Sequence, residues 1–172
     1  MKTAKEIGIA GVFVALLIGV QFALSFVSGV ELVTVLVVSY CYFFGVKRGL
    51  LTMVAFSLIR CLIFGFMPNV IVLYLVYYCL IALLFGFLGN KLGHAVNVKT
   101  TVIVTVVACI LTCVFTLLDD VITPLITGMS ANGYKAYFLG SLPTMLRQVI
   151  CSIISVPLLF YPLVKLYQTV HK

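Results

Sequence analysis

The chain has 172 residues, of which 64% are hydrophobic and 9% are charged, and its mean hydropathy is +1.30. These values exclude a soluble domain of ordinary composition and predict a protein that lies in a lipid bilayer. The formal net charge is +7, but no basic stripe with interleaved aromatic residues supports a nucleic-acid partner. We therefore expect a single membrane domain over residues 1–172, surrounded by lipid.

Continuous apolar runs follow one another along the chain, and each is expected to be a helix, because lipid offers no partner to unpaired backbone groups. A helix needs about 20 residues to cross the bilayer. The first run is too long for the core of a cleaved signal peptide, so it is expected to remain as a transmembrane helix. The predicted helices cover residues 6–26, 30–45, 48–66, 68–89, 100–118 and 142–166. The expected fold is an all-α integral membrane protein with six transmembrane helices.

The first helix has small residues on one flank. Gly8, Gly11, Ala15 and Gly19 follow one another at spacings of three and four residues, which places them on one face. Small residues of this kind allow a second helix to approach closely. Two interpretations stay open: packing inside the protein, or a docking surface for a partner subunit around Gly11 and Ala15.

The segment between the fifth and sixth helices differs from the rest of the chain. Residues 121–140 contain Pro124, Gly128, Gly133 and Gly140, all of which disfavour a helix. We expect a long loop here, with room for a short helix or for a part that dips back into the protein.

The basic residues indicate the orientation. If six helices alternate, eight Lys and Arg residues fall on one side of the membrane, and Lys135 falls in a loop on the other. Cytoplasmic loops carry the excess of positive charge, so both termini are expected to be cytoplasmic. The eight residues are Lys2, Lys5, Lys47, Arg48, Lys91, Lys99, Lys165 and Lys172.

The six cysteines fall inside apolar runs without CxxC spacing. This pattern is typical of small buried side chains rather than of disulfides or metal ligands. We expect no metal ion and no cofactor.

The other ionisable residues gather toward the outer half of the predicted bundle. They are Glu31, Arg60, Asp119, Asp120 and Arg147. A charge within hydrocarbon costs roughly 2.5 to 3.5 kcal/mol, so Arg60 and Arg147 should face protein or water. Two interpretations stay open: structural pairs of Arg147 with Asp119 or Asp120 and of Arg60 with Glu31, or the same pairs within an outward-facing solute pocket. The five residues are the candidate substrate-binding residues.

The start of the last helix suggests what such a pocket accepts. Ser141 is a suitable N-cap and Pro143 suits a first turn, so the positive end of the helix dipole should lie beside Arg147. This combination favours an anionic or carbonyl-rich solute group. Adjacent side chains diverge on a helix, so we expect Asp119 to face inward and Asp120 to face the loop or water.

Two stretches resemble the substrate-binding S components of energy-coupling factor transporters, which take up vitamins in bacteria. Gly11 and Ala15 are similar to the AxxxA-type motif of that family, with Gly in the first position. The stretch LGSLPTMLRQVICSIISVPLLFYPLVKL, residues 139–166, resembles the last helix of riboflavin- and pantothenate-type members. The resemblance implies a solute-binding subunit of the bacterial cell membrane. Its partners would be a vitamin-like solute, a transmembrane coupling subunit docked at Gly11 and Ala15, and two cytoplasmic ATPase subunits.

Other functions remain as alternatives. No GxxxxGK[ST] motif occurs, so ATP hydrolysis must come from partners, and we expect no enzyme activity in this chain. An intramembrane aspartyl enzyme would need Asp119 and Asp120 to converge, but neighbours on a helix point about 100° apart. A membrane scaffold of the rod-shape-determining type has a similar size and needs no solute.

Overall fold

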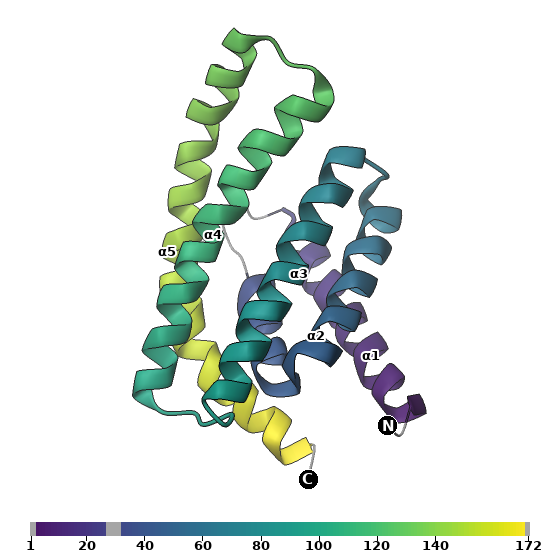
Figure 1. Cartoon of the computed structure of the whole chain (residues 1–172), viewed down its shortest axis with the longest axis vertical. Helices are drawn as coiled ribbons and strands as arrows, with labels where there is room; N and C mark the ends of the chain where they lie inside the picture. Colours follow the sequence, from purple (N-terminus) through teal and green to yellow (C-terminus); the bar gives the residue numbers. More distant parts are fainter. Residues whose placement is uncertain (1–2, 27–31, 171–172) are drawn as a thin grey trace.

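The computed structural model describes residues 3–26 and 32–170, and every regular element in this part is an α-helix (Figure 1). The expectation of an all-helical chain is confirmed. The helices are α1 (Thr3–Leu24), α2 (Val33–Phe64), α3 (Pro68–Lys91), α4 (Val98–Thr127) and α5 (Ala131–Val170).

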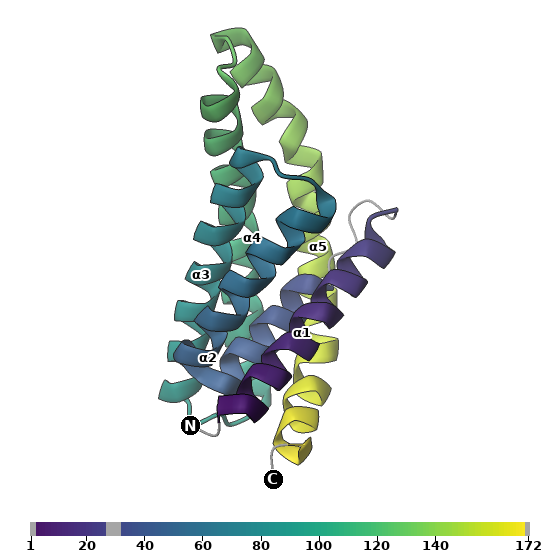
Figure 2. The same ribbon diagram turned by 90° about the vertical axis from the view of Figure 1, so that its right-hand side faces the viewer.

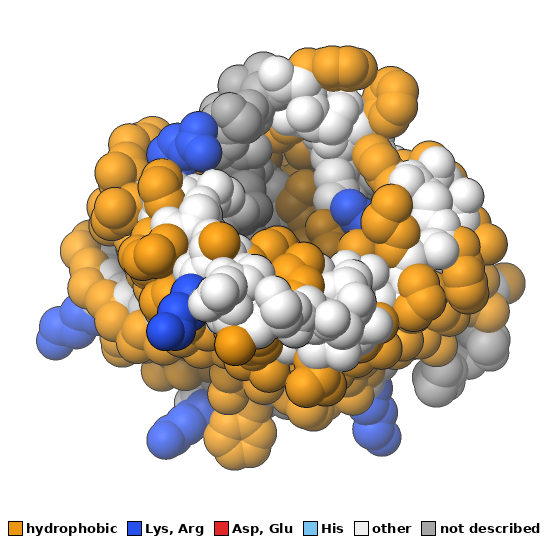
Figure 3. Space-filling view, turned by 90° about the horizontal axis from the view of Figure 1, so that it is seen from above, with side chains coloured by type: hydrophobic (Ala, Val, Ile, Leu, Met, Phe, Trp, Pro, Cys, Tyr) orange, Lys and Arg blue, Asp and Glu red, His pale blue; other side chains and the backbone are white. Residues whose placement is uncertain are grey.

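Four of these helices are long and apolar enough to cross a membrane: α1 over Glu6–Leu24, α3, α4, and α5 over Ala131–Thr169. Large apolar side chains point outward along them, and in Figure 3 hydrophobic side chains surround the periphery of the molecule. The same view shows a hollow in this face. Helices α4 and α5, with 30 and 40 residues, are about 45 and 60 Å long, well beyond the roughly 30 Å hydrocarbon core. In the two perpendicular views their connection rises beyond the ends of α2 and α3 (Figures 1 and 2).

Helix α2 is divided into two arms that fold back on each other at Gly45. This glycine has φ 77° and ψ 178°, a conformation that is essentially restricted to glycine. The hydroxyls of Tyr40 and Thr52 lie 3.0 Å apart, whereas a straight helix would separate these residues by about 18 Å. The predicted division between residues 30–45 and 48–66 therefore matches a turn. The first arm, residues 33–44, is about 18 Å long and is too short to cross the hydrocarbon core alone.

The first arm of α2 is the centre of the molecule. Val35, Val37 and Val38 are completely buried, and α2 makes its most extensive contact with α3. On another side the ring of Tyr42 meets that of Phe160 from α5, with centroids 5.2 Å apart. A helix that is apolar on all sides is stable only when other helices surround it.

The expected loop over residues 121–140 is wrong, because two helices meet there in a tight hairpin. Helix α4 continues through Pro124 and ends at Gly128, whose φ of 67° is the left-handed conformation typical of a helix C-cap. Helix α5 starts at Ala131, so Ser141 lies within the helix and is not its N-cap. Extensive contact between α4 and α5 outweighs the weak local preference of the proline and glycines.

The start of α1, the turn of α2 and the end of α5 lie at one end of the molecule (Figure 1). We call this the basic end, because Lys47, Lys91, Lys99 and Lys165 are all exposed near it. Arg48 is here too, and its guanidinium forms an ion pair with Glu6 of α1 at 2.5 Å. Lys2 and Lys172 lie outside the described residues.

Candidate functional site

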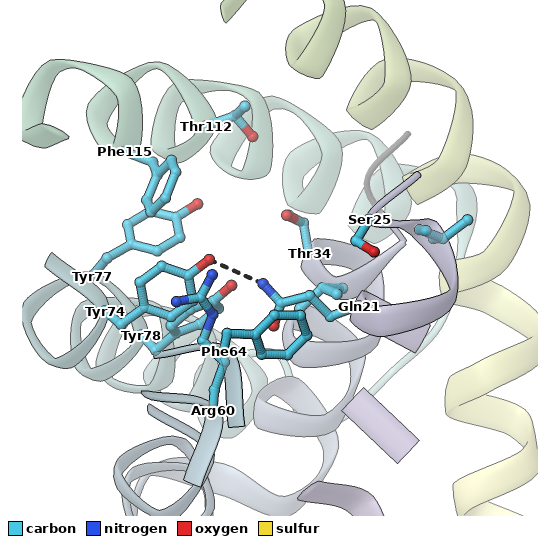
Figure 4. A pocket seen from close by; sticks show the side chains of 12 residues that line it. Gln21, Ser25, Thr34, Arg60, Phe64, Tyr74, Tyr77, Tyr78, Thr112 and Phe115 are labelled. Carbon is cyan, nitrogen blue, oxygen red and sulfur yellow. Dashed lines mark hydrogen bonds between the residues drawn. The ribbon is translucent and has the colours of Figure 1, made fainter. Parts of the chain in front are cut away.

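A cavity of about 220 Å³ lies between α1, α2, α3 and α4, at the end of the first α2 arm that is remote from Gly45 (Figure 4). We call it the aromatic cavity. Its walls are formed by Gln21, Leu24, Ser25, Val33, Thr34, Arg60, Phe64, Tyr74, Tyr77, Tyr78, Thr112 and Phe115.

Helix α3 supplies the aromatic wall. Tyr74, Tyr77 and Tyr78 are spaced three and four residues apart, so they project from one face, and each is less than 9% exposed. The ring of Tyr77 contacts that of Phe115 from α4, with centroids 4.6 Å apart, and the rings of Tyr74 and Tyr78 are 5.2 Å apart. In Figure 4 these rings line one side, and Thr34 and Ser25 lie opposite. The cavity thus has a flat aromatic side and a hydroxyl-bearing side.

Arg60 brings a positive charge to the aromatic wall. Its guanidinium carbon lies 4.0 Å from the ring centroid of Tyr74 and 5.1 Å from that of Phe64. Cation–π contact of this kind holds the side chain in place. The buried Nε atom has no hydrogen-bond partner, and within residues 3–26 and 32–170 no carboxylate lies at ion-pair distance from Arg60. The guanidinium therefore retains an unused donor beside the cavity.

Gln21 of α1 is a second polar group at this cavity. Its Nε2 donates to the hydroxyl of Tyr74 at 3.0 Å, whereas its Oε1 is buried without a partner. A buried carbonyl oxygen without a donor costs free energy, about 1 to 3 kcal/mol. A solute that brings an N–H or O–H group would recover this interaction.

The first arm of α2 begins at the same cavity. Val33 and Thr34 line it, and the N-cap residue Leu32 offers no side-chain cap. The first N–H groups of a helix lack partners within the helix, and this end of the helix dipole is positive. Both this end of α2 and Arg60 favour negative charge in the cavity.

A second cavity, of about 440 Å³, lies between α4 and α5. We call it the hairpin cavity. Phe115 lines both cavities, so its ring forms part of the wall between them. The remaining walls are Thr116, Asp119, Ala136, Tyr137, Gly140, Ser141, Thr144 and Gln148.

Asp119 connects three helices through hydroxyl groups. Its Oδ1 accepts from Thr123 Oγ1 at 2.6 Å, and its Oδ2 accepts from Tyr137 of α5 at 2.9 Å. Thr123 Oγ1 in turn accepts from Asn69, at the start of α3, at 3.1 Å. Asp119 is half-buried and lines the hairpin cavity.

Asp120 is the more buried of the two aspartates, with 3% of its surface exposed, so it does not face loop or water as expected. Its Oδ2 accepts from Ser141 Oγ at 2.8 Å, and its Oδ1 has no hydrogen-bond partner. The burial follows from the hairpin, because α5 covers the side of α4 that a loop would have left open.

The four predicted substrate-binding residues that the structure describes do not gather in one place. Arg60 lines the aromatic cavity, whereas Asp119 lines the hairpin cavity with Asp120 nearby. Arg147 is exposed and donates to Pro143 O and Thr144 Oγ1 of its own helix, both at 3.4 Å. The hydrogen bonds described for the two aspartates go to hydroxyl groups and not to Arg147. Glu31, and with it the expected pair with Arg60, lies outside the described residues.

The small residues of α1 lie on the outside of the protein. Gly8, Gly11, Ala15 and Gly19 are exposed, and a Cβ atom added to any of the three glycines would meet no heavy atom within 4 Å. The interpretation as internal packing is therefore wrong. Gly11, Ala15 and Gly19 line an apolar groove of about 470 Å³, completed by Ile59 and Ile63 of α2. We call it the α1 groove.

The polar and aromatic residues around Arg60 in the aromatic cavity were not predicted from the sequence. Gln21 is a polar residue inside the first apolar run, and the three tyrosines share one face of the fourth predicted helix. These two signals were present in the sequence, but nothing in it joined them to Arg60.

No family model matches the chain, and no curated protein or solved structure is significantly similar to it.

Proposed function

We propose that the protein is the substrate-binding membrane subunit of an importer of the energy-coupling factor type, which captures a vitamin or a related micronutrient. The aromatic cavity carries the proposal: Arg60 and Gln21, each with an unused hydrogen-bonding atom, meet buried tyrosines inside an otherwise apolar helical protein. Ionisable residues inside a membrane are costly and usually mark a functional site. A scaffold subunit has no need of such a cavity.

In the proposed arrangement the basic end faces the cytoplasm and the aromatic cavity lies in the outer half of the membrane. The exposed lysines at the basic end support this orientation, since positive charge is enriched in cytoplasmic loops. Both arms of α2 then lie in the membrane beside the four long helices, which gives six membrane segments. The first arm reaches only part of the way across.

Cysteine labelling tests this orientation. Asn132 at the hairpin and Ala95 at the basic end are both exposed. In Asn132→Cys an impermeant thiol reagent should label the protein on intact cells, whereas Ala95→Cys should react only after permeabilisation. The nearby Asn97 is also exposed but is not a suitable position, because its side chain caps α4 by accepting from Thr100 N at 2.8 Å. The parent protein with its natural cysteines is the control, and the reverse labelling pattern would place the cavity toward the cytoplasm.

The α1 groove is the proposed docking surface for the transmembrane coupling subunit. It is apolar, lined by small residues and open, and such surfaces let helices pack closely within lipid. The chain contains no ATP-binding motif, so in this proposal two cytoplasmic ATPase subunits supply the energy through the coupling subunit.

Ala15→Trp should separate docking from binding. The indole would fill the α1 groove, so uptake by the complete transporter is expected to fall more than tenfold, whereas solute affinity of the isolated protein should stay within twofold. Leu16→Trp is the matched control, because Leu16 is also exposed but points about 100° away on α1. Both variants are assayed for uptake and for co-purification of the coupling subunit. Normal uptake by a complex of normal stoichiometry would exclude the groove as the docking surface.

Native mass spectrometry of the purified protein tests the function itself. The wild-type protein should carry a bound small solute, which is detected when it dissociates in the spectrometer. The Arg60→Gln variant should carry less than a tenth as much. Arg48→Gln is the control, since Arg48 pairs with Glu6 at the basic end and does not line the aromatic cavity. A well-folded protein that neither carries nor takes up any small solute would contradict the proposal and favour a scaffold.

A further inference from the structure

The size of the aromatic cavity restricts what it holds. Its volume is about 220 Å³, and a dry cavity of about 150 Å³ is enough for one benzene molecule. The remaining space corresponds to roughly two water molecules, at about 30 Å³ each. A single six-membered ring with one small substituent therefore fills most of the cavity, whereas two fused rings with a carboxylate need more space than about 220 Å³ leaves beside the first ring.

The walls favour a flat solute. Tyr77, Tyr78 and Phe115 line the cavity with aromatic rings. Contacts of Tyr77 with Phe115 and of Tyr78 with Tyr74 hold these rings in place. Aromatic side chains stack on or meet the edge of a further ring with a gain beyond simple burial. An aliphatic solute of the same size would lose this gain.

The charge around the cavity favours an anion. Aromatic walls also suit cations, but the guanidinium of Arg60 already covers the ring of Tyr74 at 4.0 Å. Arg60 and the start of α2 both contribute positive charge, and no carboxylate from the described residues lines the cavity. A carboxylate is the group that a guanidinium with an unused N–H donor binds best.

We infer that the aromatic cavity selects a compact planar anion, namely a single aromatic or heteroaromatic ring that carries one carboxylate. Arg60 binds the carboxylate, the tyrosines and Phe115 bind the ring, and Gln21 Oε1 accepts a hydrogen bond from a donor group on the ring. The inference rests on the proposed function, because it specifies the solute of the same site.

Benzoate and benzamide, which have the same shape and differ in charge, provide the test. The full-length protein in detergent, freed of co-purified solute by dialysis, is titrated calorimetrically with each. Benzoate should bind at least tenfold more tightly than benzamide and than cyclohexanecarboxylate, and 2-naphthoate should not bind. In Arg60→Gln the affinities for benzoate and benzamide should become equal, while Arg48→Gln keeps the wild-type preference. Because the wild-type comparison needs no substitution, a variant that fails to fold does not remove the test.

Four results would overturn the inference. Equal affinity of the wild-type protein for benzoate and benzamide would exclude selection by charge. A preference for benzoate that arises only in Glu31→Gln would mean that Glu31 already neutralises Arg60. Native mass spectrometry gives the third result. If the wild-type protein carries a neutral or multi-ring solute, and the Arg60→Gln variant no longer carries it, the solute class is wrong although the proposed function stands. If neither probe nor natural solute binds, the proposed function fails as well.

Discussion

Gly89→Ala is expected to destabilise the folded protein by about 3 kcal/mol or more. A Cβ atom at Gly89 would lie 2.0 Å from the carbonyl oxygen of Tyr42 and 2.9 Å from its carbonyl carbon. Both are backbone atoms, so no side chain can turn aside, and α2 and α3 have to separate. Tyr42 lies directly before the turn at Gly45, so the separation loosens the turn that brings the two arms of α2 together.

Gly140→Ala is the matched control for this substitution. A Cβ atom at Gly140 would meet no heavy atom within 4 Å, and alanine favours a helix over glycine by roughly 0.5 to 1 kcal/mol. The temperature at which half of the protein leaves the monodisperse peak on size-exclusion chromatography should fall by many degrees in Gly89→Ala and stay the same or rise in Gly140→Ala. Gly86→Ala, whose Cβ would lie 2.6 Å from the backbone nitrogen of Val46, should resemble Gly89→Ala. Similar midpoints for Gly89→Ala and Gly140→Ala would exclude this close contact between α2 and α3.

The helices were predictable because long apolar runs leave few alternatives. The turn at Gly45 was also predictable, since a glycine followed closely by Lys47 and Arg48 interrupts an otherwise apolar sequence. The length of the first α2 arm was not predictable, because its buried central position depends on contacts with α3 and α5 that are remote in sequence.

The hairpin of α4 and α5 was missed for a physical reason. Local preferences of Pro124, Gly133 and Gly140 are a weak guide when a helix packs along its length against a neighbour. Of the proline and the three glycines in that segment, only Gly128 acts as a helix end. The hydrogen bond that Asp119 accepts from Tyr137 also holds α4 and α5 together, and the local sequence contains no sign of it.

The candidate site was predictable only in part. Arg60 stands out because a charge inside an apolar run needs an explanation. The faces of α1 and α3 that meet it do not stand out, because a helix that is apolar on all sides gives no periodic signal of which side is buried. Gln21 and Tyr74 are 53 residues apart, and only the packing of α1 against the other helices brings them within hydrogen-bond distance.

Phe115→Ala is expected to change the size of solute that the protein accepts. Phe115 lines both the aromatic cavity of about 220 Å³ and the hairpin cavity of about 440 Å³, so removal of its ring should join them. Tyr77 would lose the ring that lies 4.6 Å away, and benzoate affinity should fall at least tenfold, whereas 2-naphthoate should gain measurable binding. Leu117→Ala is the control, because Leu117 lies on the same helix but is 47% exposed and lines neither cavity. Calorimetric titration of both variants with both probes gives the answer. If Phe115→Ala keeps the wild-type preference for the single ring and still rejects 2-naphthoate, Phe115 does not form the boundary of the solute site, and the solute must lie further from α4, toward Arg60 and Gln21.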